Sequence, residues 1–240
     1  PMTGGAGGRA MMDGADGSGS THSFLKNTPI EVNELEVPMR FERYGLARDS
    51  GGPGRHRGGL ATEMQFKVFA PNSRVTARNR DRTVFQGWGI RGGRPGANSR
   101  FWTNPGTSRA VNLKNTDIIK VGPGDVVYIA CGGAGGHGDP LEREPSAVLG
   151  DVRCAFVSVA QAREAYGVVI ADGTVDAAAT ARLRAQMQAG QDRNDAFFDY
   201  GPARRAHEAV WTDANYVALT GLLAAAPVHW RSYLKHRVFD

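Results

Sequence analysis

Glycine is concentrated in short stretches of the first 140 residues, and this distribution limits which folds the chain can form. The stretches lie within residues 1–20, 51–59, 87–96 and 132–138. A residue without a Cβ atom lets two backbones approach closely, and it tolerates positive φ values. We therefore expect tight glycine loops packed against other elements, with a flexible tail as the alternative for residues 1–20. Ordered-looking sequence follows at once, so we expect the chain to begin inside a larger fold.

Alternating apolar and polar residues between the glycine stretches predict β-strands. From Ile30 the pattern becomes β-like, and over residues 37–41 it alternates strictly, as in a strand with one solvated face. Residues 60–69 alternate again and end at a turn signal, while residues 117–131 predict a strand–turn–strand unit. Residues 1–140 are therefore expected to form a β-rich domain.

After residue 140 the pattern becomes helical. Helix-start signals stand at Pro145, at Ser158 with Gln161, at Asp176 and near Thr212. The aromatic and basic stretch 229–239 is expected to pack on a surface. The chain is thus predicted to have an α+β fold. Its N-terminal two-thirds is β-rich with glycine-rich loops, and residues 141–240 form a helical C-terminal region.

Charge and hydropathy exclude two broad classes of function. The formal net charge of +5 and the pI of about 9.5 suggest nucleic-acid binding. The basic glycine stretches are short, however, and patterned apolar runs separate them, so we expect no nucleic-acid partner. No run approaches the ~18–20 apolar residues of a membrane span, so we expect no membrane. Two cysteines, Cys131 and Cys154, do not make a disulfide framework, which favours a reducing, cytoplasmic compartment.

The run GGAGGHG contains a G-x-G-x-x-G pattern directly after an apolar strand. The pattern uses Gly133, Gly135 and Gly138. A dinucleotide site needs a helix N-terminus immediately afterwards, and Asp139 with Pro140 interrupts such a helix. We therefore expect no nucleotide on this chain. Two interpretations remain: a glycine turn that approaches another element, or a nest of N–H groups for carboxylate, bicarbonate or phosphate.

Metal ligands are present only as weak pairs. His137 with Asp139 could form a two-ligand corner, and Asp13, Asp16 and His22 could form another. No histidine shows the spacing that places two ligands on one helical face. We expect these groups to stabilise loops, so the sequence predicts no metal on this chain.

Motifs for nucleophilic catalysis are absent from the sequence. There is no G-x-S-x-G motif, and Cys131 has no base nearby in the sequence. Glu31 and Glu34 would point to opposite faces of the expected strand, so one strand would not present them as an acid–base pair. One could be buried and functional, or both could belong to a solvated face.

Five ordered segments carry motifs of one known family. They are Gly14-Ala15-Asp16-Gly17 with Asn27-Thr28-Pro29-Ile30-Glu31 and Glu34, then Asp49 to Gly54 with Arg57-Gly58-Gly59, then Gly87-Trp88-Gly89 with Gly92-Gly93 and Pro95-Gly96, then Pro123-Gly124-Asp125 with residues 132–140, and Asp151-Val152 through Tyr166-Gly167-Val168-Val169. Together, over about residues 4–170, they resemble the C-terminal half of a hydantoinase B/oxoprolinase subunit. Ala134 and His137 depart from the commonest family residues.

The resemblance implies a larger enzyme complex. Such B-type subunits act with an A-type subunit of the sugar-kinase/actin-like class, which binds ATP with Mg²⁺ and phosphorylates the substrate. The missing partner would be the N-terminal half of the B-type subunit, which carries the family's Asp/His-rich metal motif and could hold a divalent metal. The implied activity is ATP-dependent hydrolysis of a lactam or other cyclic amide, a small-molecule substrate. A related ketone carboxylase, or a non-catalytic assembly module of such a complex, is the alternative.

The resemblance also points to residues expected at the site. We expect Glu31, His137 and Asp139 to be catalytic. Asn27, Thr28, Asp49 and Arg57 are expected to bind substrate, the last two as a charged loop pair.

Overall fold

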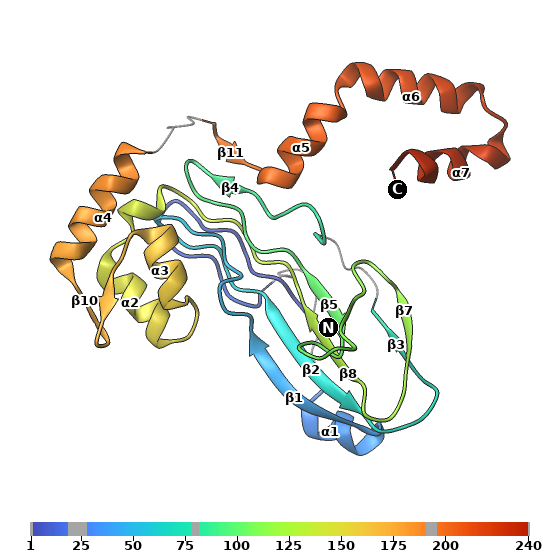
Figure 1. Cartoon of the computed structure of the whole chain (residues 1–240), viewed down its shortest axis with the longest axis horizontal. Helices are drawn as coiled ribbons and strands as arrows, with labels where there is room; N and C mark the ends of the chain where they lie inside the picture. The colour runs from blue at the N-terminus through green and yellow to red at the C-terminus, as the bar shows by residue number, and fades with distance from the viewer. Residues whose placement is uncertain (1, 19–27, 78–81, 191–195, 240) are drawn as a thin grey trace. The chain divides into compact units, whose positions relative to one another are not determined.

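The computed structural model describes residues 2–18, 28–77, 82–190 and 196–239. The chain divides into two compact units, residues 1–201 and residues 202–240. In Figure 1 the first unit consists of a sheet, a set of extended segments and a group of short helices. The α+β class with a helical C-terminal part is confirmed. The predicted domain boundary at residue 140 stays a prediction.

A five-stranded antiparallel sheet organises the β-rich part. Its strand order is β1-β2-β8-β5-β6, and these strands span Met39–Leu46, Thr62–Val68, Val126–Ala130, Arg100–Thr103 and Val111–Asn112. Phe66 lies opposite Phe41 on one side and Val127 on the other, so large apolar side chains line up across three strands. Strands β3 (Ser73–Thr76) and β7 (Ile118–Val121) form a separate antiparallel pair.

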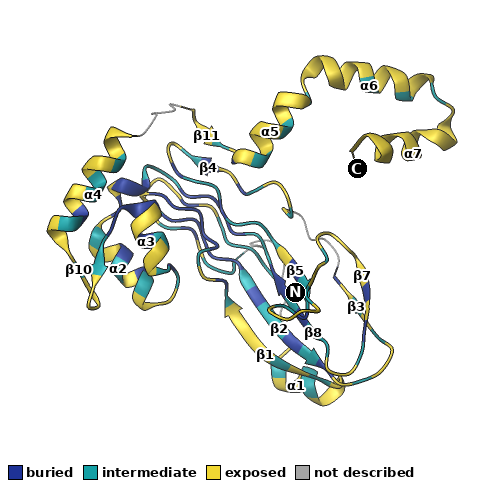
Figure 2. Ribbon diagram, in the orientation of Figure 1, coloured by how far each residue is buried: buried dark blue, intermediate teal, exposed yellow. Residues whose placement is uncertain are grey.

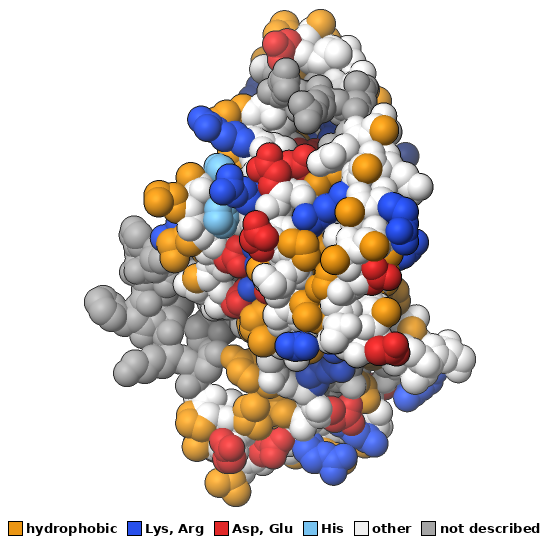
Figure 3. Space-filling model, turned by 90° about the vertical axis from the view of Figure 1, so that its left-hand side faces the viewer, with side chains coloured by type: hydrophobic (Ala, Val, Ile, Leu, Met, Phe, Trp, Pro, Cys, Tyr) orange, Lys and Arg blue, Asp and Glu red, His pale blue; other side chains and the backbone are white. Residues whose placement is uncertain are grey.

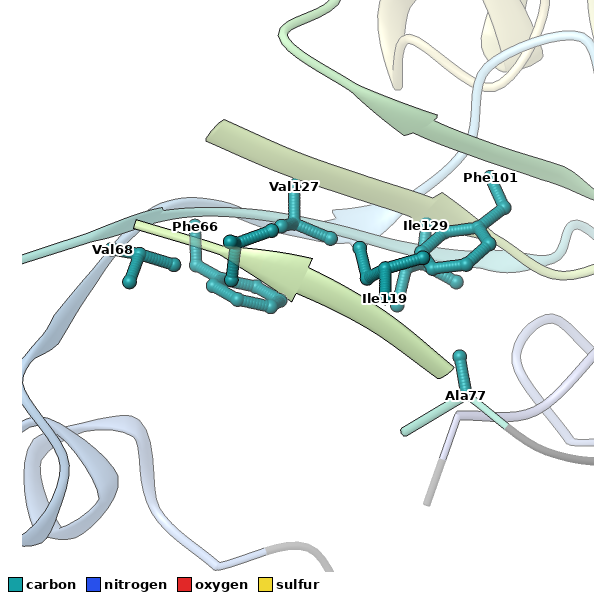
Figure 4. Close-up of a cluster of buried hydrophobic side chains, with 8 residues drawn as sticks. Phe66, Val68, Ala77, Phe101, Ile119, Val127 and Ile129 are labelled. Atoms are coloured by element: carbon teal, nitrogen blue, oxygen red, sulfur yellow. The ribbon is translucent and has the colours of Figure 1, made fainter. Parts of the chain in front are cut away.

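The main hydrophobic core lies between this sheet and the β3–β7 pair (Figure 4). In Figure 4 the side chain of Ile119 on β7 lies beside Phe101 and Ile129 of the sheet. The buried members are Phe66, Val68, Ala77, Phe101, Ile119, Val121, Val127 and Ile129. Period-two alternation places these apolar side chains on one face of each strand. The strand predicted within residues 60–69 is confirmed as β2.

Four glycine-rich segments lie side by side next to the sheet (Figure 1). They cover residues 4–17, 50–59, 87–97 and 132–138, and we call them the glycine bundle. The segments are extended, and backbone hydrogen bonds join them, such as Gly59 N–H to Ala6 O (2.8 Å) and Gly133 N–H to Ala97 O (2.9 Å). A Cβ atom on Gly133 would overlap the carbonyl oxygen of Ser50. The predicted close approach of glycine backbones is confirmed, and the flexible-tail alternative is wrong for residues 4–17.

Short helices cover the other end of the bundle and have a small core of their own. They are η1 (Pro140–Glu142), α2 (Pro145–Arg153), α3 (Val159–Tyr166) and α4 (Ala177–Ala189), with the hairpin β9 (Ile170–Ala171) and β10 (Thr174–Val175). Ser158 Oγ accepts the N–H of Gln161 (3.0 Å), and Asp176 caps α4 in the same way. These predicted caps are confirmed. Val148, Val157 and Tyr166 are among the residues that fill the core.

The structure corrects the strand predicted from Ile30. Residues Ile30–Glu36 form helix α1, and strand β1 begins only at Met39. Glutamate and leucine favour helices, and strict alternation begins only at Val37, so the helical preference wins before that point. Glu31 and Glu34, three positions apart, therefore share one helix face instead of opposite strand faces. Glu34 accepts the N–H of Phe41 (2.6 Å) and joins α1 to β1.

The second unit consists of α5 (Pro202–Val210), α6 (Asp213–Ala225) and α7 (Val228–Phe239). Thr212 accepts the N–H of Asn215 at 3.4 Å, which confirms the helix start predicted near Thr212. Strand β11 (Phe198–Asp199) precedes this unit and pairs with β4 (Gly89–Ile90) of the glycine bundle. Among the described residues, no helix is long and apolar enough to cross a membrane.

Candidate functional site

The glycine run 132–138 lies inside the bundle, where five of its seven N–H groups donate to backbone carbonyls of neighbouring segments. Gly133 donates to Ala97, Gly136 donates to Arg94 (3.0 Å), and Gly138 donates to Ile90 (3.0 Å). A nest for an anion needs consecutive N–H groups that point at a ligand. The structure therefore supports the other interpretation of this run, a glycine segment that closely approaches neighbouring backbone.

His137 pairs with His56 at the edge of the bundle. Each backbone N–H donates to the other residue's carbonyl, at 2.9 and 3.0 Å, which sets two imidazoles on adjacent segments. Burial, together with the positive charge of Arg91 and the neighbouring His56, lowers the pKa of His137. The ring is therefore neutral at pH 7 and able to accept a proton. Figure 3 shows histidine atoms directly beside basic side chains on one face of the molecule.

Asp139 follows this histidine but serves the next helix. Its Oδ1 accepts the N–H of Leu141 at 2.9 Å and so caps η1. In the described part of the chain, no group of three or more His, Cys, Asp or Glu side chains is arranged to hold a metal ion. His22, one of the sequence candidates, lies outside the described residues.

A buried network of charged side chains joins the glycine bundle to the helices. We call it the ion network: Asp13, Asp16, Arg57, Arg143 and Asp151. Arg143 donates to both carboxylate oxygens of Asp13 at 2.7 Å and to Asp151 Oδ2 at 2.8 Å. Arg57 donates to both oxygens of Asp16, at 2.7 and 3.1 Å. These are bidentate, charge-assisted contacts, the strong kind.

The two arginines are the buried centre of this network. The side chains of Arg57 and Arg143 are only 4% and 6% exposed. A buried guanidinium without partners would cost several kcal/mol, so the three carboxylates are needed to hold the two charges inside. The Arg57 guanidinium also lies 5.2 Å from the ring centroid of Phe156. The network thus fixes the bundle against the helices.

The carboxylates respond to this environment in opposite directions. Burial by itself would raise the pKa of Asp13, but the hydrogen bonds and charge of Arg143 outweigh it and hold the pKa below its usual value. For Asp151 burial prevails over Arg143 and Arg57, and its pKa is raised. Each carboxylate contacts a guanidinium within hydrogen-bonding distance, which favours its charged form.

Two buried polar atoms beside the network have no hydrogen-bond partner among the described residues. They are Nε of Arg57, which lies 3.5 Å from Asp151 Oδ1, and the hydroxyl of Tyr166. Burial raises the pKa of Tyr166, and Arg143 and Asp151 are its main charged neighbours. The network therefore has unused hydrogen-bonding capacity at its centre.

The predicted substrate-binding residues are distributed over separate places. Asp49 accepts the N–H of Ser158 at 2.7 Å, whereas Arg57 pairs with the ion network, so the two do not form one charged pair. Thr28 and Glu31 are exposed at helix α1. In Figure 1 α1 lies at the far end of β1 from the helices that follow Asp139. Asn27 lies outside the described residues.

Sequence reasoning misses most of the ion network. It names Asp13 and Asp16 as part of a weak ligand set that is expected to stabilise loops, and it does not place Arg143 or Asp151 among the site residues. One signal in the sequence could have revealed Asp151. It lies three positions after Val148 on α2, so both residues are on the inward face of that helix. A charge at such a position indicates a buried partner of opposite sign.

These features define an α+β protein whose sheet and helices are joined through closely packed glycine segments and buried ion pairs. The family model for hydantoinase B/oxoprolinase matches residues 1–140, more than half of the chain. The chain belongs to the hydantoinase B/oxoprolinase family.

Three curated relatives place this chain within the family. It is 34% identical to the beta subunit of the caprolactamase of Pseudomonas jessenii, over 75% of this chain and 32% of the relative. It is 32% identical to the B-type subunit of a putative D-/L-hydantoinase of Pseudomonas sp. (strain NS671), over 76% of this chain and 31% of the relative. It is 28% identical to the acetone carboxylase alpha subunit of Xanthobacter autotrophicus, over 66% of this chain and 25% of the relative.

Two solved structures have a similar fold. The ATP-dependent caprolactamase from Pseudomonas jessenii matches 77% of this chain and 33% of its own, with 31% identity and a TM-score of 0.61. A nucleotide-free acetone carboxylase matches 92% of this chain and 32% of its own, with 24% identity and a TM-score of 0.63, which shows the fold alone. The chain spans a quarter to a third of the length of the curated relatives described above.

Proposed function

We propose that this chain forms part of the B-type subunit of an ATP-dependent hydrolase of lactams or other cyclic amides. It acts with an ATP-binding A-type subunit that phosphorylates the substrate. The observation that carries this proposal is the 34% identity to a caprolactamase beta subunit over three-quarters of the chain. The similarity to a B-type hydantoinase chain, whose name also refers to a cyclic amide, supports the same substrate class.

The proposed reaction has a clear physical need for ATP. An unstrained lactam resists attack by water because its carbonyl carbon is a poor electrophile. Phosphorylation of the amide oxygen creates a better electrophile and a leaving group, and hydrogen-bond donors then stabilise the charge that develops in the transition state. ATP and its Mg²⁺ belong to the partner subunit in this proposal, and a divalent metal belongs to the N-terminal part of the B-type subunit.

On this chain we assign catalytic roles to Glu31, His137 and Asp139. The lowered pKa of His137 supports a neutral imidazole that accepts a proton from the attacking water. The exposed position of Glu31 leaves its carboxylate accessible to substrate or to another chain. Asp139 fixes the chain immediately after His137 by capping η1, so its contribution is to position that imidazole.

The residues to which we assign substrate positioning act from separate places. Thr28 lies just before α1 and supplies a polar group there, and we assign the same role to Asn27, which precedes it in the sequence. Asp49 and Arg57 act through the loops that they hold, since both have hydrogen-bond partners within the first unit. We also propose a cytoplasmic location, since two cysteines in 240 residues do not make a disulfide framework.

The alternative activity is ATP-dependent carboxylation of a ketone. It is favoured by the 28% identity to an acetone carboxylase alpha subunit over 66% of the chain. The two reactions differ in their co-substrates, because a carboxylase consumes bicarbonate with ATP and a hydrolase turns over ATP with lactam alone.

The test uses the chain in its complete complex, with ATP hydrolysis measured under two conditions. We expect ATP turnover that depends on a lactam and needs no bicarbonate. Turnover that depends on both a ketone and bicarbonate would replace the proposal with the carboxylase. The variant His137→Ala should lower turnover at least about tenfold while leaving assembly intact, with the exposed Val159→Ala as a matched control. Unchanged turnover in His137→Ala would leave this chain as an assembly module.

A further inference from the structure

The glycine bundle places two imidazoles side by side. His56 and His137 each donate the backbone N–H to the carbonyl of the other, at 3.0 and 2.9 Å, as in a hydrogen-bonded pair of an antiparallel ladder. In such a pair both side chains point to the same side, with Cβ atoms about 5 Å apart. The pairing therefore brings together two titratable groups that are far apart in the sequence. We call them the histidine pair.

Close packing of glycines holds the histidine pair in place. A Cβ atom on Gly8 would lie 2.5 Å from the carbonyl oxygen of His56, and one on Gly54 would lie 2.6 Å from the backbone nitrogen of His137. Figure 2 shows the extended segments of the bundle mostly in the colours of buried and intermediate residues, and both histidines are intermediate. The backbone around the pair thus has little room to move, which is the preorganisation that a catalytic pair needs.

The two imidazoles have neighbours of opposite charge. Nδ1 of His56 lies 3.9 Å from Oδ1 of Asp13, so a protonated His56 forms an ion pair with this carboxylate. The charged neighbour of His137 is instead the guanidinium of Arg91, and burial, Arg91 and His56 together lower the pKa of His137. These surroundings favour a proton on His56 and a neutral His137. Two titratable groups whose surroundings differ in this way are suited to the roles of acid and base.

The ion network fixes the carboxylate that faces His56. Asp13 accepts two hydrogen bonds from Arg143, both at 2.7 Å, and the backbone N–H of Arg57 at 2.8 Å. With its three carboxylates ionised, the network has one negative charge more than its two guanidiniums balance, and a protonated His56 balances it. Because Nδ1 of His56 faces Asp13, Nε2 is the ring nitrogen that can act on another group.

Opening a phosphorylated lactam needs one proton removed and another supplied. A base takes a proton from the water that attacks the activated carbon, which then carries a hydroxyl, the phosphate oxygen and the ring nitrogen. Departure of the phosphate from this carbon forms the lactam again, so ATP is hydrolysed without product. Departure of the nitrogen opens the ring, but an amine leaves readily only when it is protonated. An acid placed at the nitrogen therefore decides between the two outcomes.

Two other uses of the histidine pair fit its surroundings less well. A metal ion needs more donors than two imidazoles, and among the described residues no group of three or more His, Cys, Asp or Glu is arranged to hold one. The guanidinium of Arg91 would also repel a cation beside His137. A bound phosphate would be repelled by Asp13, which lies 3.9 Å from His56. Proton transfer is the use that both charged neighbours favour.

We propose that His56 is the general acid that protonates the ring nitrogen of the lactam, opposite His137 as the general base. This inference rests on the proposed function. Nε2 of His56 gives its proton to the nitrogen, the C–N bond breaks, and its electron pair stays on the nitrogen of the amine. The hydroxyl becomes the carbonyl of an acyl phosphate and loses its proton to solvent. A second water then breaks the C–O bond to phosphate, and exchange with solvent returns both rings to their starting states. Asp13 is the positioning residue that holds His56.

The ratio of phosphate released to lactam opened tests this role in the complete complex. The wild type should release phosphate and opened lactam in equal amounts. His56→Gln stays polar but has no proton to transfer, so ring opening should fall at least about 100-fold, phosphate release should fall less, and the ratio should rise. Arg55→Gln changes the adjacent side chain, which pairs with Glu142 at the surface, and should leave the ratio unchanged. An unchanged ratio in His56→Gln, even with a lower rate or a higher KM, would overturn the proposal.

The pH dependence of kcat/KM for ring opening keeps the test valid even if the variant does not fold. His137 has to be neutral, so the wild-type value should fall as the pH is lowered, and His56 has to be protonated, so it should fall again as the pH is raised. His56→Gln should keep the fall at low pH and lose the fall at high pH. A wild type without a fall at high pH, or a variant that retains it, would overturn the proposal. A wild-type complex without lactam-dependent ATP turnover would instead refute the proposed function, and this inference with it.

Discussion

The sheet and the glycine bundle lie next to each other in the first unit, but they are packed differently. Side chains fill the space in the sheet, whereas backbone atoms fill it in the bundle. In the sheet, side chains such as Phe101 and Val127 interdigitate between β-layers. In the bundle, backbone lies directly on backbone, and a Cβ atom on Gly58 or Gly135 would overlap a neighbouring carbonyl oxygen. The sheet is therefore sensitive to lost volume, whereas the bundle is sensitive to added volume.

The bundle also lacks the usual source of stability. Removing apolar side chains from water contributes most of the favourable free energy of folding, and glycine has none to remove. Glycine also loses more backbone entropy on folding than any other residue does. Hydrogen bonds between segments and the buried ion network are what remain to hold the bundle together. The comparison therefore predicts that single substitutions change the stability of the protein differently in the sheet and in the bundle.

The largest effect is expected from adding a single methyl group to the bundle. Gly133→Ala places a Cβ atom against the Ser50 carbonyl, and both atoms belong to backbone that hydrogen bonds hold in place. We expect a loss of at least about 5 kcal/mol, enough to prevent folding of a typical domain. Chemical denaturation of the purified variant measures it. A stable, fully folded variant would break the comparison, because it would mean that the segments can move apart.

Loss of the ion network should be the next largest effect. Arg143→Met keeps much of the side-chain volume but leaves Asp13 and Asp151 without their shared guanidinium. Breaking a buried ion pair in this way costs about 3–5 kcal/mol. Urea denaturation of the wild type and variant gives the difference. The surface pair Arg204–Glu208 is the control, since Arg204→Met should cost no more than about 0.5 kcal/mol.

The sheet should respond to lost volume in the ordinary way. Val127→Ala removes two methyl groups at a fully buried position, and we expect a cost of about 2–3 kcal/mol from lost transfer free energy and the cavity left behind. The variant should still fold, unlike Gly133→Ala. A denaturation midpoint for Val127→Ala below that of the wild type, beside a Gly133→Ala variant with no cooperative transition, sharpens the contrast. A larger loss for Val127→Ala than for Gly133→Ala would reverse it.

The sheet is more predictable from the sequence than the bundle because strands have a local signal. Alternation over residues 60–69 locates β2, and turn and capping residues locate the helix starts at Pro145, Ser158 and Asp176. The glycine stretches indicate close approach but not which segments approach each other, because glycine carries no periodic pattern. The strand prediction for residues 30–36 is wrong because Ile30 and Val32, two positions apart, fit the period of a strand, whereas Val32 and Leu35, three positions apart, fit that of a helix, and so short a window does not decide between them.

The candidate site is less predictable still. The ion network joins Asp13 to Arg143, which are 130 positions apart, and nothing local in the sequence links them. The resemblance to a family locates His137 and Asp139 in one place, and the structure adds His56 as a neighbour of His137. Long-range pairing of charges depends on how the bundle packs, which single-sequence reasoning does not supply.

Acid should weaken the bundle more than the sheet, through Asp13. Its folded pKa is lowered, so its contribution is fully present above the unfolded pKa of about 4 and is lost as pH falls through the folded value. Asp151 has a raised pKa and acts in the opposite direction. The net loss of stability in acid is therefore smaller than the loss caused by Arg143→Met. The stability difference between wild type and Asp13→Asn should shrink as pH falls from about 5 to about 3. A difference that stays constant over this range would show that Asp13 does not carry the acid response.

The smallest effect on stability, and the only stabilising one, is expected from a glycine-to-alanine substitution outside the bundle. Gly150 lies on the exposed side of α2, and a Cβ atom there meets nothing within 4 Å. Alanine loses less backbone entropy than glycine in a helix, so Gly150→Ala should stabilise the protein by up to about 1 kcal/mol. A small rise in the denaturation midpoint is the expected result. Because Gly150→Ala and Gly133→Ala make the same chemical change, opposite signs attribute the cost in the bundle to close backbone approach. If Gly150→Ala instead destabilised the protein as strongly as Gly133→Ala, close approach would no longer explain why glycine fills these segments.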